Sequence, residues 1–578
     1  MKIWFLTHSF NSLAQRLFVE LTQCGHDLSI EFDINDAVTI QAVELFQPEL
    51  IIAPFLKRAI PEIIWRTHTC FIVHPGIVGD RGPSALDWAI MNSQAEWGVT
   101  VLQANAEMDA GDIWTSETFP MRLAKKSSLY RHEVVETAVC AVLTAVKHYG
   151  TKTFKPVPLN YANPAVHGRL QKPMQQIDRS IDWEQESSQT ILKKIHAADG
   201  FPGVLNMLFG KAYYLFDACL EEHLSGKPGA IIAKRNNAIC RATVDGAIWI
   251  GHVKRKDATE ASFKLSASMA LKEHLAKTPE IPFDPFSTKS LRTYCDIWFE
   301  QQNDVGYLHF SFYNGAMDTT QCQRLQAAYL QATQCDVRVI VLMGGADFWS
   351  NGIHLNHIEY ADSPAVESWR NINAMNDLVH TIITTNRQLT IAALQGNAGA
   401  GGVFLSLAAD NIYARGSVIM NPHYKSMGNL YGSEYWTYLL PKRVSKDNVK
   451  SLTQNRLPIG THEACKIGLI DDCFALNQAE FLEKISTLST DMSKAESLDE
   501  MQGIMIVHEN LLSKRLLHRT LNDVYFSDNK KVVGKSLGGW GGDFVLIAIE
   551  WNKTEWTKYI KKKEMETIFS YDEMVFRK

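Results

Sequence analysis

The sequence predicts a multidomain α/β protein. At 578 residues the chain is too long for one hydrophobic core. Strand-like and helix-like segments alternate over residues 1–150 and again from residue 290 onward, which is the pattern of parallel sheets covered by helices. Between these regions, short strands separated by turns are typical of a small β-barrel. We therefore expect three domains, over residues 1–170, 171–280 and 285–578.

Residues 1–150 predict a doubly wound parallel sheet. The strand-like segments are KIWFL, LSIEF and ELIIAPF, and helical periodicity covers NSLAQRLFVELTQCG and residues 37–46. Such sheets bind ligands at the carboxyl ends of their strands, so a site is expected in the loops after Phe5, Phe55 and Val73. The first of these loops, THSFNS, contains no G-x-G-x-x-G, which counts against a nicotinamide or flavin dinucleotide.

The middle of the chain predicts a linker and then a small, OB-like β-barrel. Proline is frequent between residues 151 and 180, which indicates a linker. A helix is expected around residues 187–198. It is followed by the β-like pieces KAYYLFDA, GAIIAKRN, AICRATVDG and AIWIGHVKR.

A second α/β pattern follows a proline-containing break at residues 279–285. The strands DVGYLHFSF, VRVIVLMGG and LTIAALQG alternate with helices expected over residues 319–333 and 365–384. Helical segments are expected over most of residues 430–578.

Composition favours a soluble cytoplasmic protein. The formal net charge of −5 provides no basic field for nucleic acid or an acidic membrane surface. Ten cysteines contain no C-x-x-C pair, which argues against structural zinc and a disulfide framework. The amino terminus lacks the long apolar region of a signal peptide, and no segment approaches the ~20 apolar residues of a membrane span. We expect no metal, no nucleic acid and no membrane insertion.

One group of candidate catalytic residues lies in the first domain. His74 directly follows a strand, where Pro75 and Gly76 turn the chain, and Asp109 lies in the loop after VTVLQA. An imidazole near a carboxylate can share a proton, polarise a carbonyl or stabilise an oxyanion. Taken singly, each residue is more simply explained by structure, because a histidine after a strand often only packs and D-x-G is a common turn.

The combination H-P-x(5)-R-G followed by W-G-V-T-x(6)-E-M-D-A-G-D resembles the enzymes that use N10-formyltetrahydrofolate, including methionyl-tRNA and glycinamide-ribonucleotide formyltransferases. The resemblance covers the first 270 residues. It implies that His74 and Asp109 handle a tetrahedral intermediate. It also implies that the pterin is held by the backbone at Arg58, Ala59, Ile60, Ala106 and Met108.

The sequence departs from the formyltransferase pattern at one catalytic position. The family begins its N-x-H motif with asparagine, whereas this chain has Ile72. Loss of one oxyanion donor costs roughly 10²–10³ in rate elsewhere. The site is therefore expected to transfer formyl slowly, to use another donor, or to serve an acceptor more reactive than an amine.

A second group of candidate residues lies in the third domain. A strand ending in the turn Asn351-Gly352, together with the glycine run at residues 399–402, can aim two backbone N–H groups at one carbonyl oxygen. The alternative is that these glycines only permit close packing.

The segments FWSNGIHL and QGNAGAGG resemble the crotonase (enoyl-CoA hydratase/isomerase) superfamily over residues 290–480. This resemblance implies an α/β spiral fold that binds coenzyme A. It implies that Ile353 and Gly401 grip a thioester carbonyl. The residues expected beside the nucleotide are Asn314, Gly315, Ala316 and Ser350, together with Ile353.

The two carboxylates that hydratases use are replaced in this chain. Phe404 and His423 stand at those positions, so hydration of an enoyl thioester is not expected. Tyr424 and Glu434 are the candidate acid–base residues instead. A glutamate beside aromatic residues is in an environment that raises a carboxyl pKa toward useful acid–base values.

Together, the two halves resemble the hydrogenase maturation factors of the HypX/HoxX type, most closely in the stretch HYKSMGNLYGSEYW. The resemblance implies carbon monoxide synthesis for the iron of [NiFe]-hydrogenase. Our hypothesis is that His74 and Asp109 assist transfer of formyl to the thiol of coenzyme A. Tyr424 and Glu434 would then promote decarbonylation of formyl-CoA to CO and CoA. The expected partners are folate, coenzyme A, and the hydrogenase large subunit or other maturation proteins.

Two alternatives stay open. One is a formyltransferase for tRNA or another amine with a regulatory CoA-binding domain. Against it, residues 171–280 contain 15 Lys and Arg and 13 Asp and Glu, and this surplus of 2 provides little grip on RNA. The other is a non-catalytic scaffold for hydrogenase assembly, which Ile72 favours.

Overall fold

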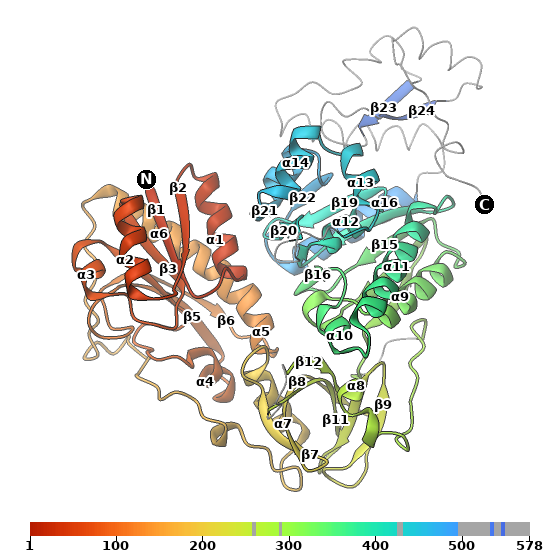
Figure 1. The fold of residues 1–578 in the computed structure, drawn as a ribbon, viewed down its shortest axis with the longest axis horizontal. Coiled ribbons are helices and arrows are strands. Elements are labelled where there is room, and N and C mark those ends of the chain that lie inside the picture. The colour runs from red at the N-terminus through yellow and green to blue at the C-terminus, as the bar shows by residue number, and fades with distance from the viewer. Residues whose placement is uncertain (257–261, 288–291, 425–431, 495–531, 537–544, 550–578) are drawn as a thin grey trace. The chain divides into compact units, whose positions relative to one another are not determined.

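The computed structural model describes residues 1–256, 262–287, 292–424, 432–494, 532–536 and 545–549 (Figure 1). The chain divides after Phe283 into two compact units, with the short segment 290–294 belonging to the first. None of the helices described is both long and apolar enough to span a bilayer. The finer boundaries at residues 170 and 280 stay a prediction.

The first sheet is the doubly wound sheet that the sequence predicts. Its strand order is β2-β1-β3-β4-β5-β6. The first four strands are parallel, β5 pairs antiparallel with β4, and β6 pairs antiparallel with β5. The bounds are β1 (Lys2–Thr7), β2 (Asp27–Phe32), β3 (Leu50–Phe55), β4 (Cys70–His74), β5 (Glu96–Gln103) and β6 (Ile113–Pro120).

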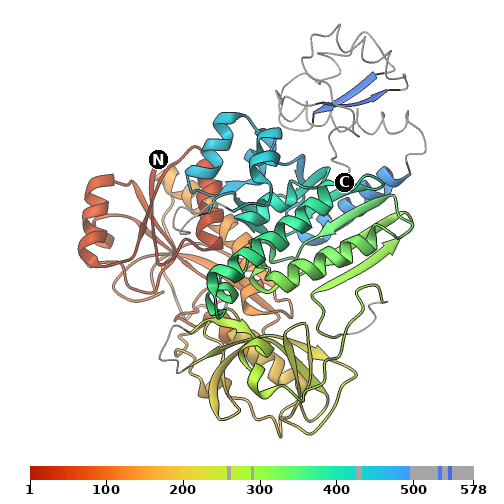
Figure 2. The same cartoon turned by 45° about the vertical axis from the view of Figure 1, so that its right-hand side comes forward.

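Helices cover both faces of this sheet (Figures 1 and 2). Successive strand residues point to opposite faces, so Ile3 and Phe5 pack with α1, α4 and α6, whereas Trp4 and Leu6 pack with α2 and α3. Asn11 caps α1 because its Oδ1 accepts a 3.0 Å hydrogen bond from the backbone of Ala14. The bounds are α1 (Ser12–Gln23), α2 (Asp36–Phe46), α3 (Glu62–Thr67), α4 (Ala85–Met91), α5 (Lys126–Leu129), the π-turn η1 (Tyr130–Val134) and α6 (Val135–Thr151).

The second sheet of this unit does not close into the barrel that its short strands predict. Its order is β7-β8-β11-β10-β9, with β12 pairing on β11, and the described strands contain no ladder from β9 back to β7. Other backbone covers the two edges instead. Lys234 of β9 exchanges hydrogen bonds with Pro279 and Ile281, and the Gln176 side chain bonds the backbone of Gly203 and Leu205 beside β7.

The elements of this second sheet match the expected segments. The strands are β7 (Val204–Leu208), β8 (Lys211–Glu221), β9 (Ile231–Arg235), β10 (Ala238–Ala242), β11 (Ala247–Arg255) and β12 (Lys264–Ser266). The helical elements are η2 (Ile177–Arg179), α7 (Ser188–Ala198), α8 (Ala267–Ala270) and η3 (Lys272–His274).

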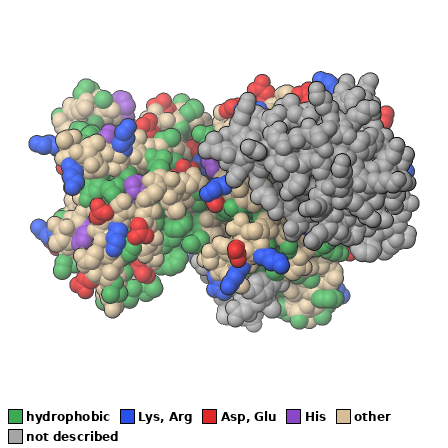
Figure 3. Space-filling model, turned by 90° about the horizontal axis from the view of Figure 1, so that it is seen from above, with side chains coloured by type: hydrophobic (Ala, Val, Ile, Leu, Met, Phe, Trp, Pro, Cys, Tyr) green, Lys and Arg blue, Asp and Glu red, His purple; other side chains and the backbone are tan. Residues whose placement is uncertain are grey.

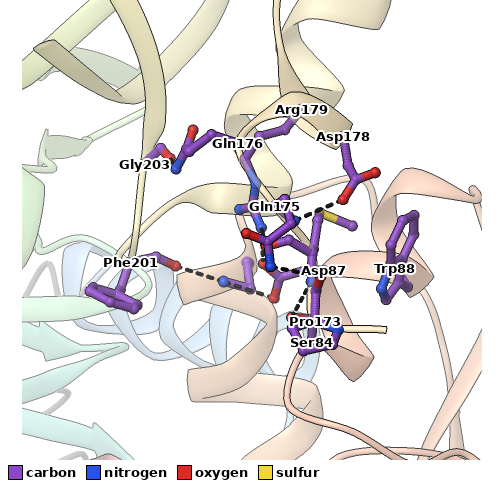
Figure 4. A network of polar contacts seen from close by, with 12 residues as sticks. Ser84, Asp87, Trp88, Pro173, Gln175, Gln176, Asp178, Arg179, Phe201 and Gly203 are labelled. Carbon is purple, nitrogen blue, oxygen red and sulfur yellow. Dashed lines mark hydrogen bonds and ion pairs between the residues drawn. The ribbon is translucent and has the colours of Figure 1, made fainter. Parts of the chain in front are cut away.

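A buried polar network holds in place the linker that connects the two sheets of the first unit (Figure 4). The ammonium of Lys126 donates to Asp87 Oδ2 at 2.9 Å and to the carbonyl of Phe201 at 2.7 Å. Arg179 of the linker reaches the other Asp87 oxygen at 3.2 Å. Burial lowers the pKa of Lys126, and the Asp87 carboxylate opposes that shift. The network ties α4, α5 and the linker to the loop before β7.

The second unit contains a six-stranded sheet in the order β13-β14-β15-β17-β19-β22. Alternate residues of β15 face opposite sides: Val339 and Val341 pack with α16, whereas Ile340 and Leu342 pack with α9 and α11. The strands are β13 (Ile297–Gln302), β14 (Val305–Phe310), β15 (Val339–Met343), β17 (Leu389–Leu394), β19 (Asn411–Arg415) and β22 (Asp472–Phe474).

A smaller sheet, in the order β16-β18-β20-β21, carries the loops with candidate site residues. Its strands are β16 (Phe348–Ser350), β18 (Asn397–Gly399), β20 (Ile419–Asn421) and β21 (Ile459–Gly460). The helical elements of the unit are η4 (Tyr313–Gly315), α9 (Thr319–Ala332), α10 (Leu355–Tyr360), α11 (Pro364–Ile383), α12 (Gly401–Ser406), α13 (Trp436–Leu439), η5 (Leu440–Lys442), α14 (Lys446–Gln454), α15 (Thr461–Lys466) and α16 (Gln478–Ser493).

The expected run of helices over residues 430–578 is present from α13 to α16. The remainder of that prediction falls outside the described residues, apart from two strands. These are β23 (Val532–Ser536) and β24 (Val545–Ile549), which pair antiparallel.

The surface of the first unit mixes charges of both signs. On the face drawn in Figure 3, Lys and Arg side chains are interspersed with Asp, Glu and hydrophobic side chains. This distribution agrees with the small net charge of the whole chain, −5.

Candidate active sites

The amino-terminal candidate site is centred on His74, the last residue of β4. Its ring is buried, with an exposed fraction of 4%. Nε2 lies 2.8 Å from Oδ1 of Asp80, and Nδ1 lies 3.6 Å from Oδ2 of Asp109. The structure therefore brings the two predicted residues together and places the imidazole between two carboxylates.

Sequence reasoning missed Asp80. It lies inside the H-P-x(5)-R-G motif, six residues after His74, and it is almost fully buried at 2% exposure. Its Oδ1 lies at hydrogen-bond distance from Nε2, and the other ring nitrogen, Nδ1, faces Asp109. A charged residue inside an otherwise glycine-rich and apolar turn is the sequence signal that could have identified it.

Glycines make this arrangement possible. A Cβ at Gly76 would overlap Nε2 of His74 and lie 2.6 Å from Oδ1 of Asp80, and a Cβ at Gly111 would overlap the carbonyl of Gln103. Asp109 itself has a φ of 53°, in the left-handed region. Its Oδ2 accepts a 3.1 Å hydrogen bond from the backbone N–H of Gly82.

Arg81 holds the loop of Asp109 from outside. Its Nε donates to the carbonyl of Met108 at 3.0 Å, and its guanidinium pairs with Glu107 at 2.7 Å. The loop is thus fixed to the same turn that carries Asp80.

Ile72 provides no polar group at the position where formyltransferases have asparagine. It lies on β4 opposite Ala53 and Leu102, and its side chain packs against the apolar cluster beneath α2 and α3. Ile72 is only partly buried and lies at the margin of this cluster.

The predicted folate-binding residues lie in two loops. Arg58, Ala59 and Ile60 follow β3, and Arg58 pairs with Asp33 and Asp36 at 3.4 and 2.5 Å. Ile60 is buried, whereas Ala59 is exposed. Ala106 and Met108 lie in the loop after β5 and are both exposed. Both loops therefore carry exposed positions.

The carboxy-terminal candidate site forms where β16 and β18 run side by side. Phe348 pairs with Asn397 and Ser350 with Ala398 in a parallel register. A Cβ at Gly352 would lie 3.2 Å from the backbone nitrogen of Gly401. The structure therefore places the predicted donors, Ile353 and Gly401, on adjacent segments.

The predicted nucleotide-binding residues adjoin these segments. Asn314 and Gly315 have φ values of 58° and 71°. Asn351 donates from its backbone to the carbonyl of Gly315 and from its side chain to the carbonyl of Asn314, both at 2.7 Å. Ser350 is buried, and its Oγ accepts the N–H of Gly352 at 3.1 Å. Ala316 is partly buried and directly follows these residues.

Asn371 of α11 links the two sides of this loop pair, and sequence reasoning missed it. Its Oδ1 accepts the N–H of His354 at 3.1 Å, and its Nδ2 donates to the carbonyl of Met317 at 3.0 Å. Met317 in turn bonds the carbonyl of Gly352 at 2.9 Å. One buried amide therefore holds the residue after Ile353 directly and the residue before it through Met317.

Tyr424 and Glu434 form a buried pair beside Gly401. The Tyr424 hydroxyl donates to Oε2 of Glu434 at 2.7 Å, and only 1% of Glu434 is exposed. A Cβ at Gly401 would overlap the Glu434 carboxyl group. Burial raises the pKa of Glu434, and the hydrogen bond from Tyr424 partly opposes that shift. Burial also raises the pKa of Tyr424 well above its ordinary value.

The backbone at Glu434 is a turn with unusual dihedral angles. Glu434 and Tyr435 have φ values of 38° and 52°. The Glu434 N–H donates to Oδ1 of Asn376 at 2.9 Å, so α11 positions this residue as well as the loop of Ile353. Residues 425–431 of the motif around Tyr424 fall outside the described residues.

The positions of the hydratase carboxylates are apolar or aromatic in character here. Phe404 is fully buried, and its ring centroid lies 5.9 Å from those of Tyr424 and Trp436. His423 is also buried. Glu434 is therefore the carboxyl group that the described part of the chain places beside Gly401.

Three protein families match successive parts of the chain. They are formyl transferase over residues 32–146, the formyl transferase C-terminal domain over residues 173–266, and enoyl-CoA hydratase/isomerase over residues 301–526. These matches confirm the predicted formyltransferase-like and crotonase-like parts.

Two relatives are similar over most of the chain. The hydrogenase maturation factor HoxX of Bradyrhizobium diazoefficiens is 49% identical over 505 residues, 87% of each protein. The crystal structure of HypX from Aquifex aeolicus in complex with tetrahydrofolic acid is similar with a TM-score of 0.83 and 45% identity, covering 90% of both chains. A methionyl-tRNA formyltransferase of Streptococcus agalactiae is 26% identical over 30% of this chain and 54% of its own length.

Proposed function

Because the chain belongs to the HypX/HoxX family of hydrogenase maturation factors, we propose that it makes carbon monoxide for the iron of a [NiFe]-hydrogenase. The carbon comes from the formyl group of N10-formyltetrahydrofolate. In the first reaction the formyl group is transferred to the thiol of coenzyme A. In the second, the formyl thioester loses carbon monoxide and the thiol is regenerated.

The surroundings of His74 support the first reaction. Oδ1 of Asp80 lies 2.8 Å from Nε2 and is placed to accept its proton, which leaves Nδ1 to act together with Asp109. These groups take the thiol proton as the C–S bond forms and pass it to N10 of the folate as the C–N bond breaks. Ala59 and Ala106 are exposed residues, and we infer that the backbone there hydrogen-bonds to the pterin.

Ile72 favours a thiol over an amine as the acceptor. The partly buried side chain packs against an apolar cluster and offers no donor to an oxyanion. An ionised thiol is a better nucleophile than an amine, so it needs less stabilisation of the tetrahedral intermediate.

The observation that carries the second reaction is the position of the Tyr424–Glu434 pair against Gly401. Backbone N–H groups of Ile353 and Gly401 stabilise charge on the thioester oxygen. Glu434 takes the formyl hydrogen as a proton while the C–S bond breaks, and it returns that proton to the departing sulfur. The products are CO and the free thiol, and no oxidant or reductant is required.

Burial and the Tyr424 hydrogen bond suit Glu434 to this role. A raised pKa makes its carboxylate a stronger base than an exposed glutamate, and the hydroxyl keeps a donor directed at Oε2. The aromatic surface of Phe404 beside the pair excludes water, which would otherwise hydrolyse the thioester.

The test is to incubate the purified protein with N10-formyltetrahydrofolate and coenzyme A and to trap gas with deoxyhaemoglobin. We expect CO only when both substrates are present. Glu434→Gln should abolish CO while tetrahydrofolate is still released. Glu483→Gln, at an exposed position of α16 in the same unit, should behave as the parent protein.

Two outcomes would overturn the proposal. Formylation of tRNA or another amine without any need for coenzyme A would show an amine formyltransferase. The absence of CO from the parent protein, or unchanged CO production by Glu434→Gln, would exclude the proposed decarbonylation.

A further inference from the structure

A group of metal-ligating side chains lies on α15 and β22, apart from both candidate active sites. One ligand atom each of Cys465, Asp472 and Cys473 lies within 4.8 Å of those of the other two. The Nδ1 atom of His462 lies 3.7 Å from Sγ of Cys473. Two thiols and a carboxylate are thus gathered around one point, and the imidazole adjoins one of the thiols.

The backbone fixes these four residues independently of any ion. His462 and Cys465 are three residues apart on α15, so they lie on the same side of the helix. Gly468, with a φ of 81°, ends this turn, and its N–H bonds the carbonyl of Cys465. The returning strand β22 then pairs with β19, with Cys473 opposite Ala414.

Core contacts on both sides hold the two elements in this register. Ala464 and Leu469 are fully buried in the main hydrophobic core. Asp471, next to the group, bonds the guanidinium of Arg443 and the backbone of Ile412, both at 2.7 Å. A ligand set held in place by packing loses little conformational entropy when it binds an ion.

We propose that Cys465, Asp472 and Cys473 bind one thiophilic divalent ion of the zinc class, and that the exposed His462 beside Cys473 completes the ligand set. Tetrahedral zinc has bonds of about 2.3 Å to sulfur and about 2.1 Å to nitrogen, which separates two such ligands by about 3.6 Å. The distance of 3.7 Å between Nδ1 of His462 and Sγ of Cys473 matches this separation. Binding deprotonates both thiols, so it releases protons.

The sequence shows no zinc motif because its ligands are spread over two elements. No C-x-x-C pair is present, and the pattern H-x-x-C-x(6)-D-C is assembled only when β22 folds back beside α15. The ion would link the short helix α15 to β22, the edge strand of the large sheet.

Cobalt(II) is the probe that tests this site. Protein treated with a chelator under reducing conditions is titrated with Co²⁺, and then with Zn²⁺. We expect one Co²⁺ per chain, with a thiolate-to-cobalt charge-transfer band and the visible bands of tetrahedral cobalt. Zinc should displace it and raise the thermal midpoint of the stripped protein.

Substitutions test whether the cobalt bands arise from these residues. Cys465→Ser and Cys473→Ser should each reduce the charge-transfer band by about half or more, and the double substitution should remove it. His462→Ala, at an exposed position that folding does not require, should weaken Co²⁺ binding about tenfold or more. Cys335→Ser, a matched control in the same unit, should leave the titration unchanged.

Three results would overturn the proposal. One is the absence of a thiolate band at equimolar Co²⁺. Another is a full band in the double cysteine variant. The third is a disulfide between Cys465 and Cys473 in protein purified and kept under reducing conditions, found by mass spectrometry of its peptides.

Discussion

The hydroxyl of Tyr424 donates a 2.7 Å hydrogen bond to Oε2 of Glu434, and both side chains are buried. Burial raises the pKa of each group. The tyrosine therefore stays protonated and remains a donor, while the glutamate becomes a stronger base than it would be in water. Both the reaction and the pH dependence of folding should show the consequences.

Glu434 should make the stability of the protein depend on pH. A raised pKa means that folded Glu434 holds its proton more tightly than the unfolded chain does. Its contribution to the free energy of unfolding is fully present below its ordinary pKa and is lost as pH rises through the folded pKa. Glu434→Gln should therefore lose less stability than the parent as pH rises above 4.5, the ordinary pKa of the glutamate side chain. Urea unfolding across this range measures it.

Exposed Glu483→Gln is the control for this measurement, because its side chain keeps contact with water in the fold. Its stability should follow the parent at every pH. Parallel curves for the Glu434→Gln variant and the parent would contradict the assignment of a raised pKa to this buried carboxyl group.

Tyr424→Phe should change the pH profile of CO release. The hydrogen bond from Tyr424 lowers the pKa of Glu434, so its removal raises that pKa further. Because the carboxylate is the reactive form in the proposed mechanism, the acidic limb of the profile should move to higher pH. The maximal rate should fall by about 10-fold or more, as the loss of one positioned donor predicts.

Initial rates of CO formation at saturating coenzyme A, measured over pH, provide this comparison. Tyr438→Phe, at an exposed position of α13, is the control and should keep the parent profile. An acidic limb that stays in place, or moves to lower pH, would show that Tyr424 does not act through Glu434.

Asn371 should be needed for decarbonylation because it positions the loop of Ile353. The proposed mechanism gives it no direct role in the reaction. Its amide oxygen accepts the N–H of His354, and its amide nitrogen donates to the carbonyl of Met317, the residue that pairs with Ile353. Asn371→Ala leaves these groups unpaired, which costs about 1–3 kcal/mol for each in unfolding free energy. The rate of CO release should fall while tetrahydrofolate release in the first reaction continues.

Asn373→Ala on the same helix is the matched control, because its side chain bonds only the carbonyl of Trp369 one turn earlier. It should change neither rate. Equal loss of both reactions in the Asn371→Ala variant would indicate general unfolding instead of a misplaced oxyanion site, and circular dichroism separates the two cases.

Asp80 should be as important for formyl transfer as the predicted His74. Asp80→Asn keeps the shape of the side chain but no longer accepts the Nε2 proton as a carboxylate, so the imidazole tautomer is no longer fixed. Release of tetrahydrofolate should fall by about 10²-fold or more. Asp112→Asn, exposed after the same loop, should retain the parent rate.

The reading of Asp80 is contradicted if Asp80→Asn transfers formyl at the parent rate. Supplying a synthetic formyl thioester to this variant should restore CO production, because the second unit is unaltered.

Local sequence patterns determined the secondary structure and the identity of several candidate residues. The strands β1, β3 and β15 follow from short apolar runs, because a strand buried on both faces is apolar at every position. His74 and Asp109 follow from motifs whose glycines sit where a Cβ would overlap a neighbour. Such constraints act between residues near in sequence.

The tertiary structure determined features that the hydrophobic periodicity of the sequence does not show. The barrel stays open because the distant segment 279–281 covers the edge of β9. Glu434 lies in a buried turn against Gly401, 33 positions earlier in the chain, and its pKa depends on that burial. Asn371 and the group around Cys473 each depend on residues from different elements being brought together. Sequence patterns specify which face of an element is apolar, whereas desolvation and ligand geometry exist only once distant elements have packed together.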